Sequence, residues 1–419
     1  MEKFCIQGMK PLFGKVQAGG SKNAALPILA ATLLSESPSV LHNVPDLLDV
    51  QTMVKVLETL GVKVERLSRG TYRIHPGDLN TSNAPYELIR KMRASFLVIG
   101  PLISRLQRAH VPLPGGCAIG SRPVDLHLKG FIHLGVKVTT HSGYIEAWSD
   151  GLKGDEVYLD FPSVGATENI MMLAATIDDE TIIANAAREP EVVDLARFLS
   201  AMGAEIEGAG TDTVIVRGVK KLRGCEHYII NDRIEAGTFC VIAAATGGEL
   251  TVQGVHPSLI LSVTTKLEEV GAQVKRVGDQ AVCISMEGRP RGTDIKTMPF
   301  PGFPTDMQAQ FMSLLCLADG VSVVTEAVFE NRFAHVGELE RMGANIKVEG
   351  RSAVVLGVDT LTGTQVTATD LRAGAGLVIA GLAAEGETEI YGISHVDRGY
   401  EDLECKLGLL GATIERVSE

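Results

Sequence analysis

The stretch Leu60-Gly61-Val62-Lys63-Val64 is the first of six copies of one phrase, an apolar residue and a glycine followed by alternating apolar residues. The other copies are Leu134-Gly135-Val136-Lys137-Val138, Met202-Gly203-Ala204-Glu205-Ile206, Val270-Gly271-Ala272-Gln273-Val274, Met342-Gly343-Ala344-Asn345-Ile346 and Leu410-Gly411-Ala412-Thr413-Ile414. Glycine ends a helix in the left-handed conformation without a Cβ penalty, and alternation is typical of a half-buried strand. Each phrase therefore predicts a helix end followed by a strand.

The six glycines are 74, 68, 68, 72 and 68 residues apart, which predicts a sixfold repeat. An apolar segment that predicts a helix precedes each phrase, at residues 24–34, 94–103, 170–177, 238–245, 308–317 and 374–384. Short strands are predicted after most of these helices, at residues 40–41, 181–183, 250–252, 321–324 and 388–390. Each unit is expected to contain helix, strand, helix, glycine, strand and strand, with a further strand bridging neighbouring units.

These units predict an α/β protein of two bodies. Units of about 70 residues are small for an independent core, so six units favour fusion into two bodies of three. The whole chain of 419 residues also favours two or three domains. An N-terminal strand within residues 3–18 is expected to pair with the last unit, which closes one body from both chain ends. The polar stretch Asn231-Asp232-Arg233 is the predicted boundary.

The composition excludes several classes of protein. Hydrophobic residues make up 45% and charged residues 21%, which excludes bulk disorder. The net charge of −12 argues against a general nucleic-acid or anionic-membrane binder, but it leaves room for a local basic pocket. The seven cysteines include no CxxC pair, which favours a reducing compartment. No signal peptide and no apolar stretch of ~20 residues is found, so no membrane insertion and a cytoplasmic location are expected.

Charged residues recur where the repeat predicts that helices start. The first-helix positions carry Lys22, Arg93, Arg233, Asp306 and Arg372. The second-helix positions carry Asp49, Arg122, Glu189, Arg332 and Arg398. Acids at helix N-termini are explained as caps or first-turn residues, but bases there are unfavourable to the isolated helix. The recurrence of these bases therefore favours the interpretation that they bind a heavily anionic ligand. The alternative interpretation is that they form surface salt bridges. Metal-binding and nucleotide-binding motifs are absent, so neither a metal nor a cofactor is expected.

One loop stands apart from the repeat. Residues 112–123 hold three prolines and three glycines around Cys117, directly before a predicted helix. A nearby Arg122 and the helix N-terminus would lower the pKa of a thiol at this position, whereas burial would raise it. Cys117 is therefore the cysteine that we expect to be functional, and the other six are interpreted as core or inert residues.

Several longer motifs resemble one family. They are Gly20-Ser21-Lys22-Asn23-Ala24-Ala25-Leu26-Pro27, Met92-Arg93-Ala94-Ser95, Pro114-Gly115-Gly116-Cys117-Ala118-Ile119-Gly120-Ser121-Arg122-Pro123-Val124-Asp125-Leu126-His127, Phe303-Pro304-Thr305-Asp306-Met307-Gln308-Ala309-Gln310, Phe329-Glu330-Asn331-Arg332-Phe333 and Asp397-Arg398-Gly399-Tyr400. Over its whole length the chain resembles the UDP-N-acetylglucosamine 1-carboxyvinyltransferases, enolpyruvyl transferases that begin peptidoglycan precursor synthesis. The resemblance implies two inverse α/β barrel domains of three βαβαββ units each. It places them at residues 22–229 and at 1–21 with 230–419, with the substrates between them.

The resemblance also implies a reaction. The enolpyruvyl group of phosphoenolpyruvate would move to the 3′-hydroxyl of UDP-N-acetylglucosamine through a tetrahedral ketal, with release of phosphate. Cys117 would donate the C3 proton and react covalently with the antibiotic fosfomycin, and Asp306 would be the base at the sugar hydroxyl. Residues that would hold phosphoenolpyruvate are Lys22, Asn23, Arg122 and Arg398. Residues that would border the UDP-sugar or line the same cleft are Arg93, Arg122, Pro123, Val124, Asp125, Leu126, Ser163, Val164, Gly165, Asp306, Val328, Arg332 and Arg372.

One departure from the family and two alternatives remain. Some members have a lysine two residues before the serine of the Ser-Val-Gly-Ala-Thr segment, where this chain has Phe161-Pro162 before Ser163. That contact to the nucleotide phosphate is therefore open. The sister enzyme 5-enolpyruvylshikimate-3-phosphate synthase is disfavoured, because its motif has serine after the lysine and lacks the Pro-Gly-Gly-Cys loop. A non-catalytic UDP-sugar sensor is disfavoured by the retention of Cys117 and Asp306.

Overall fold

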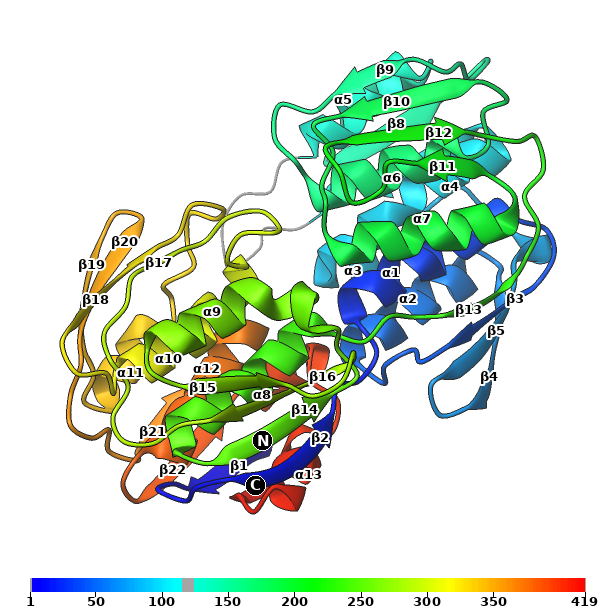
Figure 1. The fold of residues 1–419 in the computed structure, drawn as a ribbon. Helices are drawn as coiled ribbons and strands as arrows, with labels where there is room; N and C mark the ends of the chain where they lie inside the picture. Colours follow the sequence, from blue (N-terminus) through cyan, green and yellow to red (C-terminus); the bar gives the residue numbers. More distant parts are fainter. Residues whose placement is uncertain (1, 115–123, 419) are drawn as a thin grey trace. The chain divides into compact units, whose positions relative to one another are not determined.

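The computed structural model describes residues 2–114 and 124–418. Within these residues the chain forms two compact units (Figure 1). Residues 2–19 and 231–418 make one unit, which we call the terminal unit, because it holds both chain ends. Residues 20–114 and 124–230 make the other, which we call the inner unit.

In the described residues the inner unit has three sheets, whose neighbouring strands are β13-β3-β5-β4, β11-β12-β10-β9 and β6-β8-β7. The strands are β3 (Ser39–His42), β4 (Lys63–Ser68), β5 (Thr71–His75), β6 (Arg108–Pro112), β7 (Lys137–His141), β8 (Tyr144–Trp148), β9 (Glu156–Tyr158), β10 (Glu180–Ala184), β11 (Glu205–Glu207), β12 (Thr213–Arg217) and β13 (Glu226–Tyr228). The helices are α1 (Lys22–Ala31), η1 (Thr32–Leu34), α2 (Leu48–Thr59), η2 (Pro76–Asp78), α3 (Tyr86–Lys91), η3 (Arg93–Val98), α4 (Ile99–Leu106), α5 (Asp125–His133), α6 (Val164–Ala174) and α7 (Pro190–Met202), where η marks a 3₁₀ helix.

The described part of the terminal unit also has three sheets, ordered β21-β22-β1-β23, β15-β16-β14-β2 and β17-β18-β20-β19. The strands are β1 (Glu2–Gln7), β2 (Phe13–Gln17), β14 (Glu249–Gln253), β15 (Gln273–Arg276), β16 (Ala281–Ser285), β17 (Ile295–Lys296), β18 (Val321–Thr325), β19 (Asn345–Glu349), β20 (Ser352–Leu356), β21 (Gln365–Thr367), β22 (Glu387–Tyr391) and β23 (Thr413–Ser418). The helices are α8 (Arg233–Thr246), η4 (Pro257–Ile260), α9 (Leu261–Glu269), η5 (Thr305–Met307), α10 (Gln308–Leu315), α11 (Val336–Arg341), α12 (Leu371–Ala383), η6 (Ile393–Arg398) and α13 (Leu403–Leu409).

Three helices make the core of the terminal unit. Helices α8, α10 and α12 pack against one another, and every residue of α12 after Leu371 is buried. The strands around them alternate buried and exposed residues, so each sheet has one face on the core and one in solvent. A Cβ on Gly376 would lie 3.0 Å from the carbonyl oxygen of Ala309, which shows how closely α10 and α12 approach. In this unit these three helices therefore lie inside and the sheets outside.

The sixfold repeat is confirmed. Each of the six predicted glycines has a positive φ, between 89° and 121°. Each glycine follows the second helix of its unit, which is α2, α5, α7, α9, α11 or α13. The predicted first helices are also present, although the second unit begins with the 3₁₀ helix η3 before α4. Strand β6 of that unit was not predicted.

The N-terminal segment differs from the single strand predicted within residues 3–18. Strand β1 pairs antiparallel with β22 and β23 of the last unit, which confirms that expected pairing. Strand β2 instead pairs parallel with β14 of the fourth unit. At the break a Cβ on Gly8 would lie 2.1 Å from the carbonyl oxygen of Ala384, so only glycine fits there, and the next residue, Met9, has a φ of 59°. The N-terminal segment therefore completes two sheets.

The helix-ending glycines give a first testable prediction. Gly343 has a φ of +96° with open space around its Cα, so Gly343→Ala adds backbone strain without a clash. We expect this change to lower the free energy of unfolding by about 1 kcal/mol, measured by urea denaturation. The matched control is Gly337→Ala, inside helix α11 and also in open space, which we expect to stabilise by about 0.5–1 kcal/mol. Equal effects of the two changes would contradict the assignment of Gly343 as a helix end.

Candidate active site

The centre of the candidate site in the terminal unit is the carboxylate of Asp306, in the 3₁₀ turn η5 that leads into α10. Its Oδ1 forms an ion pair with Nη2 of Arg332, and its Oδ2 lies 3.1 Å from Nη2 of Arg372. The arginine side chains are 4% and 3% exposed, whereas that of Asp306 is 27% exposed. Two buried cations therefore hold one carboxylate at the surface of the helical core, and they favour its ionised form.

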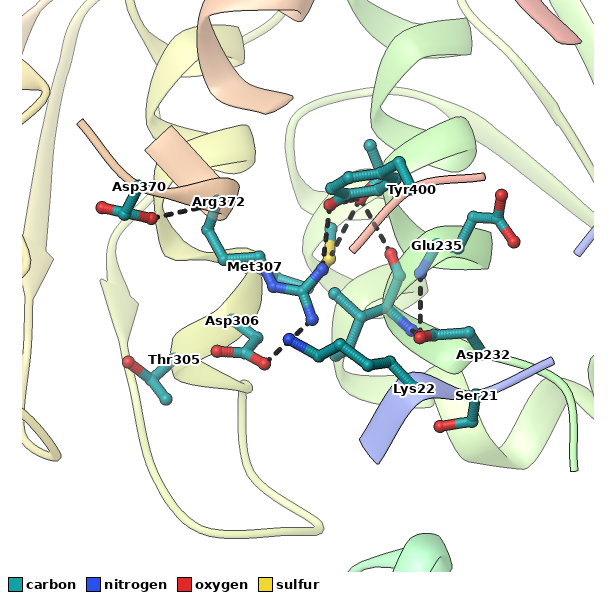
Figure 2. Close-up of polar contacts among 12 residues, drawn as sticks. Ser21, Lys22, Asp232, Glu235, Thr305, Asp306, Met307, Asp370, Arg372 and Tyr400 are labelled. Atoms are coloured by element: carbon teal, nitrogen blue, oxygen red, sulfur yellow. Dashed lines mark hydrogen bonds and ion pairs between the residues drawn. The ribbon is translucent and has the colours of Figure 1, made fainter. Parts of the chain in front are cut away.

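Tyr400 holds Arg372 from the other side, as Figure 2 shows. Nη1 of Arg372 donates to the Tyr400 hydroxyl at 3.2 Å, and Nε2 of Gln310 donates to the same oxygen at 3.0 Å. Thr238 lies 3.0 Å from that oxygen and gives its own proton to the carbonyl oxygen of Ile234. The Tyr400 proton is therefore donated to Thr238. This network joins α8, α10 and α12 behind the Asp306 carboxylate.

Local sequence fixes the start of the helix that carries Arg372. Oδ1 of Asp370 accepts hydrogen bonds from the backbone amides of Arg372 and Ala373, at 2.8 and 3.0 Å. An aspartate is a preferred N-cap because it satisfies amides that have no partner within the helix. The cap sets the first turn of α12, and the Arg372 side chain leaves that turn toward Asp306 (Figure 2).

Burial and charge both act on this cluster. Burial alone would lower the pKa of Arg372, but the neighbouring Asp306, Tyr400 and Asp232 more than offset it and raise that pKa. For Tyr400 the effect of burial has the opposite sign: burial raises the pKa of this phenol, although the charge of Arg372 lowers it in part. At neutral pH the cluster therefore contains a cationic arginine and a neutral phenol.

In the inner unit, Lys22 is the first residue of α1, and the hydroxyl of Ser21 caps that helix. Nζ of Lys22 lies 3.3 Å from Oδ2 of Asp49, in the first turn of α2, and both side chains are less than 10% exposed. Asp49, which we interpreted from the sequence as a cap or a first-turn acid, is a first-turn acid and is also the partner of a cation predicted to bind an anion. The attraction between the two groups offsets part of the cost of burying them.

The start of α6 is a second polar feature of the inner unit. Ser163 caps the helix by accepting from the amide of Ala166 at 3.3 Å. A Cβ on Gly165 would lie 3.3 Å from Cε1 of His127, so this ring lies close against the helix start. Nδ1 of His127 lies 3.2 Å from Nδ2 of Asn169, an amide donor, which places the ring proton on Nε2. Burial, helped by the charge of Arg93, lowers the pKa of His127 to about 3, so the ring is neutral.

The other predicted site residues fall in three groups. Arg93 is the first residue of η3, Asn23 lies in α1, and both are half-buried. Val124, Asp125 and Leu126 form the start of α5, and Ser163, Val164 and Gly165 form the start of α6. Val328 follows β18, and its amide donates to Glu326 at 2.8 Å. The predictions for Cys117, Arg122 and Pro123 fall outside the described residues.

Two predicted positions need correction. Arg332 and Arg398 were expected at the starts of second helices, but α11 begins at Val336 and α13 at Leu403. Arg332 lies in the loop before α11, and Arg398 is the last residue of η6. Both positions were found by counting back from the glycine that ends the helix. Helices α11 and α13 are short, so this count passes their first residues and ends in the segment before them. Arg332 is therefore positioned by side-chain contacts and not by a helix terminus.

Sequence reasoning missed several residues that build the site. Tyr400, Gln310 and Thr238 hold Arg372 and the η5 turn, and Glu326 holds the loop of Val328. Tyr400 and Gln310 stood in the quoted motifs, but their polar groups had no assigned role. Gln310 and Thr238 could have been noticed as polar residues within largely apolar segments, whereas Tyr400 lies among charged residues and offers no such signal.

Outside residues 1, 115–123 and 419, no group of three His, Cys, Asp or Glu residues is arranged to hold a metal ion. In the same part of the chain, no helix is long and apolar enough to cross a membrane.

Comparison with known proteins identifies the family. The model for EPSP synthase (3-phosphoshikimate 1-carboxyvinyltransferase) matches residues 6–407. The chain is 57% identical, over the full length of both proteins, to UDP-N-acetylglucosamine 1-carboxyvinyltransferase 2 of Carboxydothermus hydrogenoformans. It is 54% identical, over 99% of both chains, to UDP-N-acetylglucosamine 1-carboxyvinyltransferase 1 of Caldanaerobacter subterraneus subsp. tengcongensis.

Solved structures agree with this result. The enolpyruvyl transferase NikO from Streptomyces tendae has a TM-score of 0.88 at 25% identity, covering 100% of this chain and 99% of that one. EPSP synthase from Acinetobacter baumannii, at 19% identity and full coverage of both chains, has a TM-score of 0.76 and shares the fold. The chain therefore belongs to the enolpyruvyl transferase family that the EPSP synthase model describes, and within it to the UDP-N-acetylglucosamine 1-carboxyvinyltransferases.

A pH dependence of stability follows from His335, which lies directly before α11. Burial lowers the pKa of His335 to about 4, with Asp370 raising it and Arg332 lowering it. Because the unfolded chain binds this proton below about pH 6.5 and the folded chain does not, stability falls as the pH drops from 6.5 toward 4. We expect a loss of up to about 1.4 kcal/mol per pH unit relative to His335→Gln, measured by urea denaturation.

The control for this experiment is His133→Gln, at the exposed end of α5. Its difference in unfolding free energy from the wild-type protein is expected to change little over the same range. A parallel pH dependence of the wild type and His335→Gln would contradict the assignment.

Proposed function

We propose that this protein transfers the enolpyruvyl group of phosphoenolpyruvate to the 3′-hydroxyl of UDP-N-acetylglucosamine and releases phosphate. The supporting observation is the Asp306 carboxylate between two buried arginines, in a chain 57% identical over its full length to a UDP-N-acetylglucosamine 1-carboxyvinyltransferase. The activity is a committed step of peptidoglycan synthesis, and thus serves cell-wall biogenesis, cell shape and division. We place the protein in the cytoplasm.

The proposed chemistry has two steps. In the first, the 3′-hydroxyl oxygen forms a bond to C2 of phosphoenolpyruvate, Asp306 takes the hydroxyl proton, and C3 gains a proton from Cys117. In the second, the Cys117 thiolate left by the first step takes a proton back from C3 of the tetrahedral ketal, the C2–C3 double bond re-forms, and the bond from C2 to the phosphate oxygen breaks, so that phosphate leaves with the bonding electrons. Such proton transfers require a base and an acid held within hydrogen-bond reach of the reacting atoms. The reaction needs no metal and no cofactor.

Asp306 suits the role of a positioned base. Arg332 and Arg372 hold both of its oxygens, so the carboxylate has a defined orientation before substrate arrives. Their charges stabilise the ionised form, which is the form that accepts a proton. They also make it a weaker base, so abstraction proceeds only as the hydroxyl oxygen bonds to carbon and its proton becomes acidic. The arrangement therefore favours a concerted addition over prior formation of an alkoxide.

Anion binding is assigned to the remaining cations. Lys22, Arg122 and Arg398, with Asn23 beside them, would hold the phosphate and carboxylate of phosphoenolpyruvate. Arg93, the starts of α5 and α6, and Val328 would border the UDP-sugar. Amides at a helix start attract phosphate oxygens. The Ser163-Val164-Gly165 turn begins an eleven-residue helix, so its amides suit this role. The domains proposed for this function are residues 22–229 and residues 1–21 with 230–419.

The activity is tested by measuring phosphate release from phosphoenolpyruvate by the purified protein. Release is expected with UDP-N-acetylglucosamine and not with shikimate 3-phosphate. Arg398→Ala is expected to raise the phosphoenolpyruvate KM about tenfold and the UDP-sugar KM by less than twofold, since one charge-assisted contact is lost. Pure folded protein that releases no phosphate with the UDP-sugar contradicts the proposed function, and equal effects on both KM values contradict the role of Arg398.

Covalent inhibition gives a separate test of Cys117. Fosfomycin is expected to inactivate the wild-type protein in a time-dependent way and to add one inhibitor mass to the peptide that contains Cys117. Cys117→Ser should abolish this labelling, because the hydroxyl of serine is a far weaker nucleophile than a thiolate. Cys405→Ser, at an exposed cysteine, is the control and should be labelled as the wild type is. Labelling that persists in Cys117→Ser would place the reactive thiol elsewhere.

A further inference from the structure

Glu326 is a buried carboxylate that the proposed chemistry does not use. It follows strand β18 directly and is 1% exposed. Its Oε1 accepts hydrogen bonds from Thr297 Oγ1 at 2.7 Å and from the amides of Val328 and Phe329 at 2.8 and 3.1 Å. Its Oε2 accepts from Thr305 Oγ1 at 2.9 Å. An ionised carboxylate only accepts hydrogen bonds, so all four contacts fit that form.

Two of these contacts lead to Arg332. Thr305 gives its only hydroxyl proton to Glu326, so its oxygen presents a lone pair to Nε of Arg332, which donates at 3.3 Å. Phe329, whose amide Glu326 holds, places its ring centroid 5.5 Å from the guanidinium carbon of Arg332. The guanidinium then contacts the Asp306 carboxylate. Glu326 is thus connected to the proposed base by a hydroxyl and by an aromatic ring.

The same carboxylate fixes the backbone on both sides of this cluster. Thr305 precedes Asp306 in the η5 turn, and Val328 follows β18. Thr297, also held by Glu326, accepts from the amide of Ala327 at 2.9 Å. A buried carboxylate with four donors costs free energy to desolvate, and replacing it by an apolar side chain would leave the two amides without partners. Glu326 thus orients the Thr305 hydroxyl and the amides of Val328 and Phe329.

We propose that Glu326 is a positioning residue for the transferase reaction: it sets the proton of the Thr305 hydroxyl and the place of the Phe329 ring, and through them the orientation of Arg332 against Asp306. It also holds the Val328 loop, which the proposed function assigns to the UDP-sugar. This inference rests on that proposed function. It predicts that changes at Glu326 affect the sugar half of the reaction and spare the binding of phosphoenolpyruvate.

Glu326→Gln tests the proposal with almost no change of shape. If the glutamine oxygen keeps the amides of Val328 and Phe329, its NH₂ group donates to Thr305. The Thr305 oxygen then accepts from that NH₂ group, and its own proton points away from residue 326. The lone pair that accepts from Nε of Arg332 in the wild type is therefore displaced. We expect kcat to fall at least tenfold and the UDP-N-acetylglucosamine KM to rise, with less than a twofold change in the phosphoenolpyruvate KM. The measurement is steady-state phosphate release.

A pair of changes at Thr305 isolates the hydroxyl. Thr305→Ser keeps the oxygen and should stay within threefold of the wild-type kcat, whereas the isosteric Thr305→Val lacks it and should match Glu326→Gln. The double variant with Glu326→Gln should be little worse than either change alone, because both break one connection. Additive losses, or equal activity of the serine and valine variants, would contradict the connection through Thr305. This pair also decides the question if Glu326→Gln fails to fold.

Glu338→Gln is the matched control. Oε2 of Glu338 accepts the amide of Thr367 at 2.9 Å, in the same unit but outside the network of Glu326. We expect its activity to stay within twofold of the wild type. A Glu326→Gln variant with kcat within twofold of the wild type overturns the proposal, as does an equal rise of both KM values. Absence of phosphate release from the wild-type protein instead contradicts the proposed function, so the two failures are distinguishable.

Discussion

The burial of helices on all sides is the constraint on which the rest of this structure depends. Helices α8, α10 and α12 pack against one another inside their sheets, and α6 is buried from Ala166 to its last residue. Such helices have room for alanine, glycine and other small or apolar residues along their length, and little room for charge. Charged side chains are therefore concentrated at the helix starts, where the chain enters the core from the surface. Asp306, Arg372 and Lys22 all occupy such positions.

The charges at these helix starts have partners of opposite charge, and in one case the partner is a loop residue, Arg332. Lys22 has Asp49 as a partner, and Arg332 and Arg372 share Asp306. Removing one member of a buried ion pair leaves an uncompensated charge, which strongly destabilises the fold. Neutral groups also contact these cations: the Tyr400 hydroxyl accepts from Arg372, and the Thr305 hydroxyl accepts from Arg332.

The repeat was predictable because its signals are local. A glycine with positive φ after a helix has a backbone reason that any copy of the phrase must share, and all six copies obey it. The break between the two N-terminal strands was not predicted; there the Gly8 backbone lies against Ala384, which is far along the chain. Counting residues from the glycine located the Asp306 and Arg372 helix starts but misplaced Arg332 and Arg398. That count assumes second helices of constant length, and α11 and α13 are shorter than α2 and α7.

The sequence by itself determined the α/β repeat, the residue types at the helix starts and, through its motifs, the family. These follow from backbone preferences and from side chains whose chemistry can be read one position at a time. Only the tertiary structure decided which charges face each other: Asp49 with Lys22, and one aspartate shared by two arginines. It also decided that Glu326 stands behind Arg332, connected to it through Thr305. Such partners come from different helices and loops, so they meet only when the helices pack, and no local pattern records the meeting.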